Sequence, residues 1–449
     1  MLTHFLSLVA ADAFALALID AETGAVTTRA ALLARAGELA AQLTASGMRS
    51  RDALAIQLPN SVDFVAAFLA ALQLDLVAVP IDRDAPETEV ANILAHFAVR
   101  GLVYRSGRTE VTTRELSTRP ALPADARLIK LTSGSTGRPK GIVTTEANLV
   151  ADCTNICATM GIHPTDRNLG AIPFSHSYGF SNLVTPLLLQ GTPVVVSNDY
   201  LPQALLELAN RHRCTVAPLI PMVFAHLATS AHGDFETVRT FISAGAPLPP
   251  ATSRRFRERF GLEIHSFYGC SECGGITYDR LGGAVERGTV GAAMEHVTLT
   301  TTGTRLGVQS ASVASGYLLD AATFQPIADG AFTTDDLVDL RDDGEVALTG
   351  RASDLINTAG KKVNPREVEA VLLQIEGVRE AKVYGEPAGA RGEVVAAAIV
   401  ATPEITRDQI RAYCRTRLSL HKVPRIVKLI DEMPVDERGK VTRAALEAL

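Results

Sequence analysis

The chain has 449 residues, of which 47% are hydrophobic, so it is long enough for several domains with well-filled cores. A net charge of −6 excludes the basic surface of a nucleic-acid-binding protein and is too small to indicate a polyanionic tail. The longest apolar runs, such as residues 66–72 and 394–401, are shorter than the roughly 20 residues that a membrane-spanning helix needs. We therefore expect a soluble globular protein with no membrane span and no nucleic-acid partner.

Helices and strands alternate along the first part of the chain. Residues 1–22 are fairly apolar, but Asp12 interrupts them and no basic residue precedes the apolar stretch, which favours a helix over a signal peptide. Further elements are predicted in this order: a helix over 29–46 ending at Gly47, a strand at 53–58, a helix over 62–72, strands over 76–81 and 193–197, and a helix over 202–211. This alternation favours an α/β fold with parallel or mixed sheets.

The chain changes character after Gly350. Residues 351–360 are polar and turn-rich, and a unit of about a hundred residues follows, which is a sensible domain size. We therefore expect a large domain over 1–350, a hinge at 351–354 and a small α+β domain over 355–449.

A helix is predicted near the start of the small domain. Asn364 is its expected N-cap, Pro365 its first residue and Glu367 a capping-box partner. An apolar stripe then continues the helix, formed by Val368, Val371, Leu372 and Ile375, and Gly377 ends it. A strand at 394–401 and a helix over 406–418 are expected to follow.

The cysteines indicate reduced thiols. The chain has six, at 153, 157, 214, 270, 273 and 414, without the density of a disulfide scaffold, so a cytoplasmic location is expected. Cys270 and Cys273 form a C-x-x-C pair that stands alone. Small side chains beside a ligand explain that pair better than a zinc or redox site.

The segment at residues 131–141, LTSGSTGRPKG, has the composition of a phosphate-binding turn. Its glycines at 134, 137 and 141 would let backbone amides point at anionic oxygens, and hydroxyls and Lys140 would supply donors and a positive charge. The spacing is not that of a Walker loop, because Pro139 precedes the lysine and Gly141 follows it. Another nucleotide-handling family is therefore indicated.

Together with four further blocks, this segment resembles the acyl-adenylate-forming superfamily, which includes acyl-CoA and aryl-CoA ligases. The blocks occur in that family's order: PFSHSYG at 173–179, YGCSE at 268–272, TDDL at 334–337 with GRASDLINTAGKKVNPREVE at 350–369, and PVDERGKVTR at 434–443. The resemblance implies a large α/β N-terminal domain with parallel or mixed sheets and a small, mobile α+β C-terminal lid. It also implies that ATP activates a fatty or aryl carboxylic acid to an acyl-adenylate, and that coenzyme A takes the acyl group, releasing AMP and pyrophosphate.

The resemblance also assigns the nucleotide site. Glu272 matches the carboxylate that helps to bind Mg²⁺, and Tyr268 matches the aromatic residue that packs on adenine. The residues implied to hold the triphosphate are Thr132, Ser133, Gly134, Ser135, Thr136, Gly137 and Lys140. Those implied to surround adenine and the acyl group are Gly245, Ala246, Pro247, Gly269 and Ser271. Taken alone, the phosphate segment is also typical of a glycine-rich surface turn and Glu272 of a solvated loop acid, and Tyr268 is more typical of core packing.

The remaining assignments fall on the histidine block and the C-terminal part. His176 matches a residue near the carboxylate and thiol tunnel, although a lone histidine is more often structural. Asp336 and Arg351 match the ribose-binding pair, and Lys440 matches the lysine that contacts the carboxylate and α-phosphate. Gly360 and Lys361 match the loop that lines the pantetheine tunnel.

Two positions depart from the family pattern. Asp335 stands where glycine is usual, and Ser353 stands at the hinge, where the family usually has Asp or Lys. The acyl pocket is expected to draw on Phe180, Met222, Ser243, Gly269 and Gly275, whose glycines would leave room for a bulky acid. Two alternatives stay open: loading of an acyl carrier protein, and a nucleotide-binding homologue without turnover. The acid, the choice of acceptor and the oligomeric state do not follow from the residues.

Overall fold

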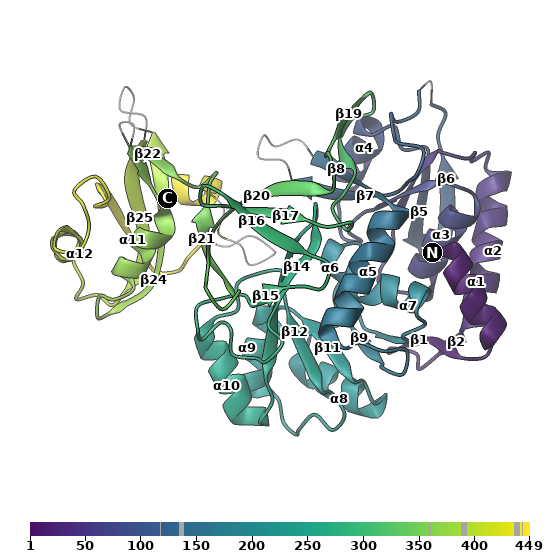
Figure 1. Ribbon diagram of the computed structural model, residues 1–449, viewed down its shortest axis with the longest axis horizontal. Helices are drawn as coiled ribbons and strands as arrows, with labels where there is room; N and C mark the ends of the chain where they lie inside the picture. Colours follow the sequence, from purple (N-terminus) through teal and green to yellow (C-terminus); the bar gives the residue numbers. More distant parts are fainter. Residues whose placement is uncertain (117, 134–138, 359–360, 388–392, 435–440, 442) are drawn as a thin grey trace. The chain divides into compact units, whose positions relative to one another are not determined.

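The computed structural model describes residues 1–449 except 117, 134–138, 359–360, 388–392, 435–440 and 442 (Figure 1). The chain divides into two compact units. The first comprises Met1–Thr300, Gly307–Phe332 and Leu340–Val346, and the second comprises Thr301–Leu306, Thr333–Asp339 and Ala347–Leu449. The predicted fold class, a large α/β N-terminal domain with a small C-terminal domain, is confirmed.

The first sheet of the large unit is mixed, with a parallel centre. Its strands lie in the order β15 (Ala292–Ala293), β14 (Gly274–Tyr278), β13 (Ile264–Cys270), β12 (Thr240–Ser243), β11 (Val216–Leu219), β9 (Asn168–Gly170), β10 (Val194–Val196), β1 (Leu16–Asp20) and β2 (Val26–Thr28). The strands from β13 to β1 run parallel, and β14 and β2 turn back antiparallel to their neighbours. The loops that follow the parallel strands therefore gather at one edge, where α/β sheets commonly bind ligands.

The second sheet of the large unit is also mixed. Its order is β19 (Thr323–Pro326), β18 (Gly316–Asp320), β8 (Pro139–Thr145), β7 (Ala126–Ser133), β4 (Val77–Pro80), β3 (Ala53–Gln57), β5 (Gly101–Ser106) and β6 (Arg108–Thr113). Strands β7 and β8 form an antiparallel hairpin, and β18 pairs antiparallel with β8. This pairing places residues 316–320 beside the segment that contains Lys140.

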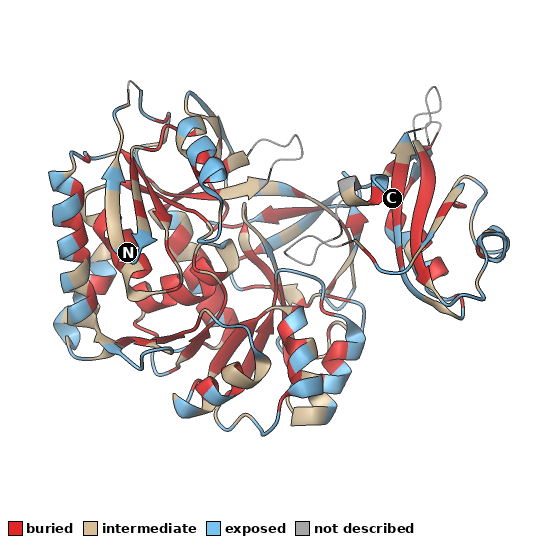
Figure 2. Ribbon diagram, turned by 180° about the vertical axis from the view of Figure 1, so that it is seen from behind, coloured by how far each residue is buried: buried red, intermediate tan, exposed pale blue. Residues whose placement is uncertain are grey.

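Helices cover and join these sheets. They are α1 (Leu2–Ala11), α2 (Arg29–Ala45), α3 (Val62–Gln73), α4 (Glu87–His96), α5 (Glu146–Met160), α6 (Ser177–Gly179), the π-helix η1 (Phe180–Val184), α7 (Thr185–Leu189), α8 (Pro202–Arg211), α9 (Pro221–Ser230) and α10 (Pro250–Phe260). One core cluster joins β3, β10, α3 and η1, with the rings of Phe68 and Phe180 in edge contact at 4.9 Å. Buried strands form the interior of each unit (Figure 2).

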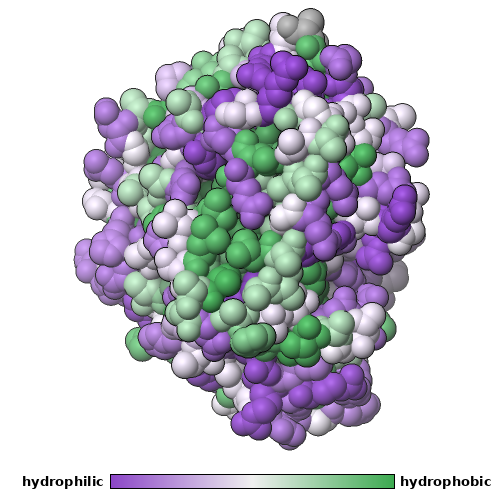
Figure 3. All heavy atoms as spheres, turned by 90° about the vertical axis from the view of Figure 1, so that its right-hand side faces the viewer, coloured by the Kyte–Doolittle hydropathy of each residue, from purple (hydrophilic) through white to green (hydrophobic). Residues whose placement is uncertain are grey.

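The outer face that carries α1 and α2 exposes apolar side chains. They gather near the middle of that face (Figure 3). Leu6 of α1 is 44% exposed. Among the residues that the structure describes, no helix is long and apolar enough to cross a membrane.

Strands β16 (Thr298–Thr302), β17 (Arg305–Gln309), β20 (Ala331–Leu340) and β21 (Val346–Arg351) contribute residues to both units. The rest of the second unit comprises β22 (Ile356–Thr358), β23 (Lys361–Val363), α11 (Pro365–Leu372), β24 (Val378–Pro387), β25 (Glu393–Ala401), α12 (Arg407–Arg415), β26 (Ile426–Ile430) and α13 (Arg443–Glu447). Its core packs α11 and α12 on the sheet β24-β25-β26.

The helix predicted after residue 364 is present as α11, but it ends at Leu372, before Ile375 and Gly377, and it lacks the predicted capping box. Asn364 caps it by accepting a hydrogen bond from the Arg366 N–H at 3.1 Å, and Val368 and Leu372 are buried. Glu367 is not a capping-box partner, because its carboxylate pairs with the Lys422 ammonium at 2.7 Å. A long-range ion pair has replaced the local hydrogen bond that the sequence predicts.

Candidate active site

The motif blocks of the large unit lie at the carboxyl edge of its parallel strands. The segment 173–179 follows β9, Gly245 follows β12, and Glu272 follows β13. A hydrogen bond of 2.8 Å joins the hydroxyls of Ser177 and Ser271, so the histidine block and the YGCSE block are in contact. Two blocks that are far apart in the sequence thus form one site.

Tyr178 anchors the histidine block to the sheet. Its hydroxyl donates to the Ile242 carbonyl at 2.9 Å and lies 3.4 Å from the Leu219 carbonyl, at the ends of β12 and β11. Burial raises the pKa of the Tyr178 hydroxyl well above its usual value, which keeps the phenol a donor. The position of His176, two residues earlier, is therefore tied to the strand ends.

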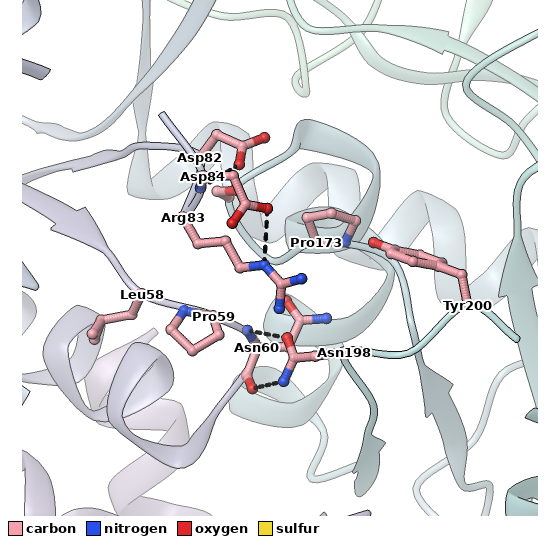
Figure 4. A pocket seen from close by; sticks show the side chains of 10 residues that line it. Leu58, Pro59, Asn60, Asp82, Arg83, Asp84, Pro173, Asn198 and Tyr200 are labelled. Atoms are coloured by element: carbon pink, nitrogen blue, oxygen red, sulfur yellow. Dashed lines mark hydrogen bonds and ion pairs between the residues drawn. The ribbon is translucent and has the colours of Figure 1, made fainter. Parts of the chain in front are cut away.

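His176 is 51% exposed, and its Nε2 lies 4.0 Å from the carboxylate of Asp82, which follows β4 of the other sheet. A pocket of about 130 Å³ lies next to this pair (Figure 4), lined by Leu58, Pro59, Asn60, Asp82, Arg83, Asp84, Pro173, Ser175, Asn198 and Tyr200. Asn60 and Asn198 exchange hydrogen bonds of 3.1 and 3.0 Å there. The pocket is smaller than the roughly 300 Å³ at which typical ligand sites begin, so it is not a complete nucleotide pocket.

The segment after β12 is an exposed turn. Gly245 has φ of +87°, a conformation that favours glycine, and Ala246 and Pro247 are exposed beside it. Ser243, the last residue of β12, is only 4% exposed, and its hydroxyl has no hydrogen-bond partner among the described residues. A buried hydroxyl without a partner is the kind of group that a ligand satisfies.

At three positions of the acyl pocket expected from the sequence, the structure shows close packing. A Cβ at Gly269 would lie 2.3 Å from the Gly274 carbonyl oxygen, and a Cβ at Gly275 would lie 2.6 Å from the Met294 sulfur. These glycines therefore accommodate close packing between β13, β14 and Met294 and do not leave space for an acid. Phe180 is a core residue at 1% exposure.

Met222 is 56% exposed on α9. Tyr268, the residue expected against adenine, is half-buried on β13 and lies opposite Thr277.

Lys140 and Glu272 both contact Tyr317, a residue that the sequence analysis missed. The Tyr317 hydroxyl donates to Glu272 Oε1 at 3.0 Å, and the Lys140 ammonium lies 5.8 Å from the centre of the Tyr317 ring. Burial and the Glu272 charge raise the pKa of Tyr317. The contact depends on β18 pairing with β8, so no local sequence signal marks it.

The segment predicted to bind phosphate falls between β7 and β8, which pair antiparallel. Thr132 pairs with Lys140, and Ser133 pairs with Pro139, at the last described positions on either side of residues 134–138. The predicted contacts of Gly134, Ser135, Thr136 and Gly137 lie outside the described residues.

Gly141 lies inside β8. A Cβ there would lie 2.6 Å from the Ile129 side chain. This glycine therefore serves core packing, in contrast to the predicted role in anion binding.

The oxygen ligands that the large unit offers suit Mg²⁺. Within the described ranges there is no group of three or more His, Cys, Asp or Glu residues that could hold a metal ion. A single half-buried carboxylate such as Glu272 nevertheless fits Mg²⁺, which is commonly held by one or two carboxylates together with substrate phosphates and water.

In the second unit, Asp336 and Arg351 form an ion pair. The Arg351 Nε donates to Asp336 Oδ1 at 3.0 Å. Partial burial lowers the pKa of the Arg351 guanidinium, but Asp336 and its acidic neighbours raise it by more.

Asp335 accepts a hydrogen bond from the Ser353 N–H at 3.2 Å, so the two residues that depart from the family pattern contact each other. Lys361 is exposed at the start of β23. Gly360 and Lys440 lie outside the described residues.

A two-sheet α/β unit with polar motif blocks at its strand ends, followed by a small α+β unit, defines the class of adenylate-forming enzymes. A family model described as "AMP-binding enzyme" matches residues 9–318, and a model of the "AMP-binding enzyme C-terminal domain" matches residues 367–440. The chain belongs to this family of AMP-binding enzymes. The predicted superfamily is thereby confirmed.

The curated relatives of the chain include CoA ligases along nearly its whole length. A sulfoacetate–CoA ligase from Cupriavidus necator is 30% identical, over 96% of this chain and 94% of the relative. A feruloyl-CoA synthase from an Amycolatopsis species is 28% identical, over 94% of this chain and 93% of the relative.

Solved structures agree with this membership. The o-succinylbenzoate CoA synthetase from Bacillus subtilis in complex with the acyl-adenylate OSB-AMP superposes with a TM-score of 0.83 at 25% identity, covering 99% of this chain and 97% of that chain. The same enzyme in complex with ATP and a magnesium ion superposes with a TM-score of 0.82, covering 99% of both chains.

Proposed function

We propose that the protein is an AMP-forming acid–thiol ligase that activates a fatty or aryl carboxylic acid with ATP and transfers the acyl group to coenzyme A. In the first step a carboxylate oxygen attacks the α-phosphorus, and the bond to the pyrophosphate oxygen breaks. In the second step the thiol of coenzyme A attacks the acyl carbonyl carbon, loses its proton and displaces AMP. Family membership together with the meeting of Lys140 and Glu272 at Tyr317 carries this proposal.

The large unit would neutralise the reacting anions. Lys140 would bind the phosphates with the hydroxyls and amides of residues 132–137, and Glu272 would hold Mg²⁺. When bound, Mg²⁺ supplies positive charge that offsets the developing charge of pyrophosphate. Tyr268 and residues Gly245 to Pro247 would bind adenine.

The C-terminal part would complete the two steps. Asp336, oriented by Arg351 at 3.0 Å, would accept the ribose hydroxyls. Lys440 would assist the first step, whereas Gly360 and Lys361 would line the tunnel for the thiol. Because Lys440 would act in the first step and Gly360 and Lys361 in the second, the small domain over 355–449 would have to turn about a hinge at 351–354. His176 would lie beside the substrate carboxylate and the thiol tunnel.

The test is ATP-dependent pyrophosphate release with and without coenzyme A, with the thioester identified by mass. The panel contains aliphatic, aromatic and amino acids, and it includes sulfoacetate and ferulate because relatives are named for them. Release with a CoA thioester supports the ligase. Release without a thioester favours a carrier protein as acceptor, and no ATP turnover with any acid contradicts the proposal. A cytoplasmic location stays a prediction, which fractionation of the native host would check.

A further inference from the structure

A tyrosine joins the two charged groups of the proposed triphosphate site. The Tyr317 hydroxyl donates to Glu272 Oε1 at 3.0 Å, and its ring lies under the Lys140 ammonium, 5.8 Å from the ring centre. The second distance is within the range of a cation–π contact. The hydroxyl of one side chain thus contacts a carboxylate, and the face of its ring lies under a cation.

Neither charge is neutralised by another side chain. Among the described residues, Glu272 and Lys140 form no ion pair with each other or with any other group. A lysine and a glutamate that pair in a partly buried site attract each other strongly. The tyrosine between them satisfies each one without removing its charge.

The sheet fixes this arrangement. Tyr317 of β18 lies opposite Ile142 of β8, and Lys140 is two residues before Ile142, on the same face of the strand. Lys140 is therefore the diagonal neighbour of Tyr317, within reach of a long side chain. The Ala314 N–H donates to the Glu272 carbonyl at 2.7 Å. This bond holds the backbone of Glu272 next to the segment that leads into β18 and Tyr317.

We propose that Tyr317 is a positioning residue that keeps Lys140 and Glu272 apart, so that the ammonium stays available to phosphate and the carboxylate to Mg²⁺. This inference rests on the proposed function. The hydroxyl orients the carboxylate, and the ring supports the lysine and blocks its approach to the carboxylate. Phenylalanine at this position keeps the second role only, and leucine keeps neither.

The test separates the two roles by binding. Calorimetry measures the affinity of the non-hydrolysable analogue AMPCPP in Mg²⁺ and in EDTA for the wild type, Tyr317→Phe and Tyr317→Leu. For Tyr317→Phe we expect the gain in affinity that Mg²⁺ brings to fall by about tenfold, the equivalent of one hydrogen bond to a charged group, with unchanged affinity in EDTA. For Tyr317→Leu we expect weaker binding in both conditions, because Lys140 then pairs with Glu272.

Tyr104→Phe is the matched control. Tyr104 belongs to β5 of the same sheet, and its hydroxyl donates to Glu110 at 3.0 Å, far along the sheet order from β8. This variant should bind the analogue like the wild type, and circular dichroism checks that all three variants are folded. The inference about Tyr317 would be overturned if Mg²⁺ raised the affinity of Tyr317→Phe for AMPCPP as much as it raises that of the wild type. Equal losses of affinity in Mg²⁺ and in EDTA for this variant would be such a result. Neither outcome would overturn the proposed function. A wild type that binds no AMPCPP would overturn the proposed function as well.

Discussion

Asp152 offers the sharpest test of how the site is built. It lies on α5, is 3% exposed, and accepts hydrogen bonds from the Gly275 N–H at 2.9 Å and from the Ser181 hydroxyl at 2.6 Å. One carboxylate therefore ties η1, which follows the histidine block, to the start of β14. Replacement of Asp152 by alanine leaves two buried donors without an acceptor.

We expect Asp152→Ala to lower the free energy of unfolding by about 2–4 kcal/mol. Each unpaired buried donor costs about 1–3 kcal/mol, and removal of a buried charge offsets part of this loss. Asp152→Asn should cost about 1 kcal/mol, since its oxygen still accepts from Gly275 and its amide can donate to Ser181. Ser181→Ala removes one bond and should fall between the two.

Urea unfolding followed by far-UV circular dichroism measures these differences, and it suits a chain without tryptophan. Steady-state kinetics of the folded variants should show a raised KM for the acid, because Gly275 and the histidine block shift. A loss below about 0.5 kcal/mol in Asp152→Ala, or equal losses in the alanine and asparagine variants, would refute the role given to the two hydrogen bonds.

Three further outcomes are expected. Lys440→Ala should abolish acyl-adenylate formation and spare thioester formation from preformed acyl-adenylate; a first half-reaction near the wild-type rate would show that the lysine is wrongly assigned. Gly360→Leu should do the reverse by filling the thiol tunnel, and equal loss of both half-reactions would argue against a tunnel there. Burial raises the pKa of Asp166, but hydrogen bonds from a backbone amide, Thr215 and Arg239 lower it by more, to a net value below the ordinary 3.8. Its contribution to stability is therefore present above pH 3.8 and lost as the pH falls below it, so acid unfolding of Asp166→Asn should be less steep than that of the wild type.

Local patterns predicted the elements well because their signals lie within one turn or strand. The helix α2 (Arg29–Ala45) and the strand β3 (Ala53–Gln57) match the predicted ranges to within one residue at each end. The N-cap at Asn364 was equally readable, since a side chain that caps its own helix needs no distant partner. Glu367 also resembled a capping residue because it is three residues from Asn364. Its carboxylate instead pairs with the ammonium of Lys422, which is distant in the sequence.

The candidate site was predictable as a set of motifs and not as a set of contacts. Tyr317 carries no signal of its own, because its role depends on the register of β18 against β8. Glycines were the other source of error. Gly141 ends the predicted phosphate segment and Gly275 was expected in the acyl pocket, yet each is needed where a neighbouring side chain, Ile129 or Met294, fills the space of a Cβ. A glycine in such a segment can serve close packing or ligand binding, and the sequence alone does not show which of the two roles it has.

The two departures from the family pattern, Asp335 and Ser353, also have a role that depends on a contact between distant segments. Asp335 stands where glycine is usual, and Ser353 stands at the hinge position that usually holds Asp or Lys. In the structure Asp335 lies in the extended strand β20, where its backbone needs no left-handed conformation. Its carboxylate accepts from the Ser353 N–H, and its carbonyl accepts from the Ala352 N–H at 2.8 Å. A glycine at 335 would offer only the second of these bonds, so the aspartate adds a contact to the very segment in which the usual charged hinge residue is missing.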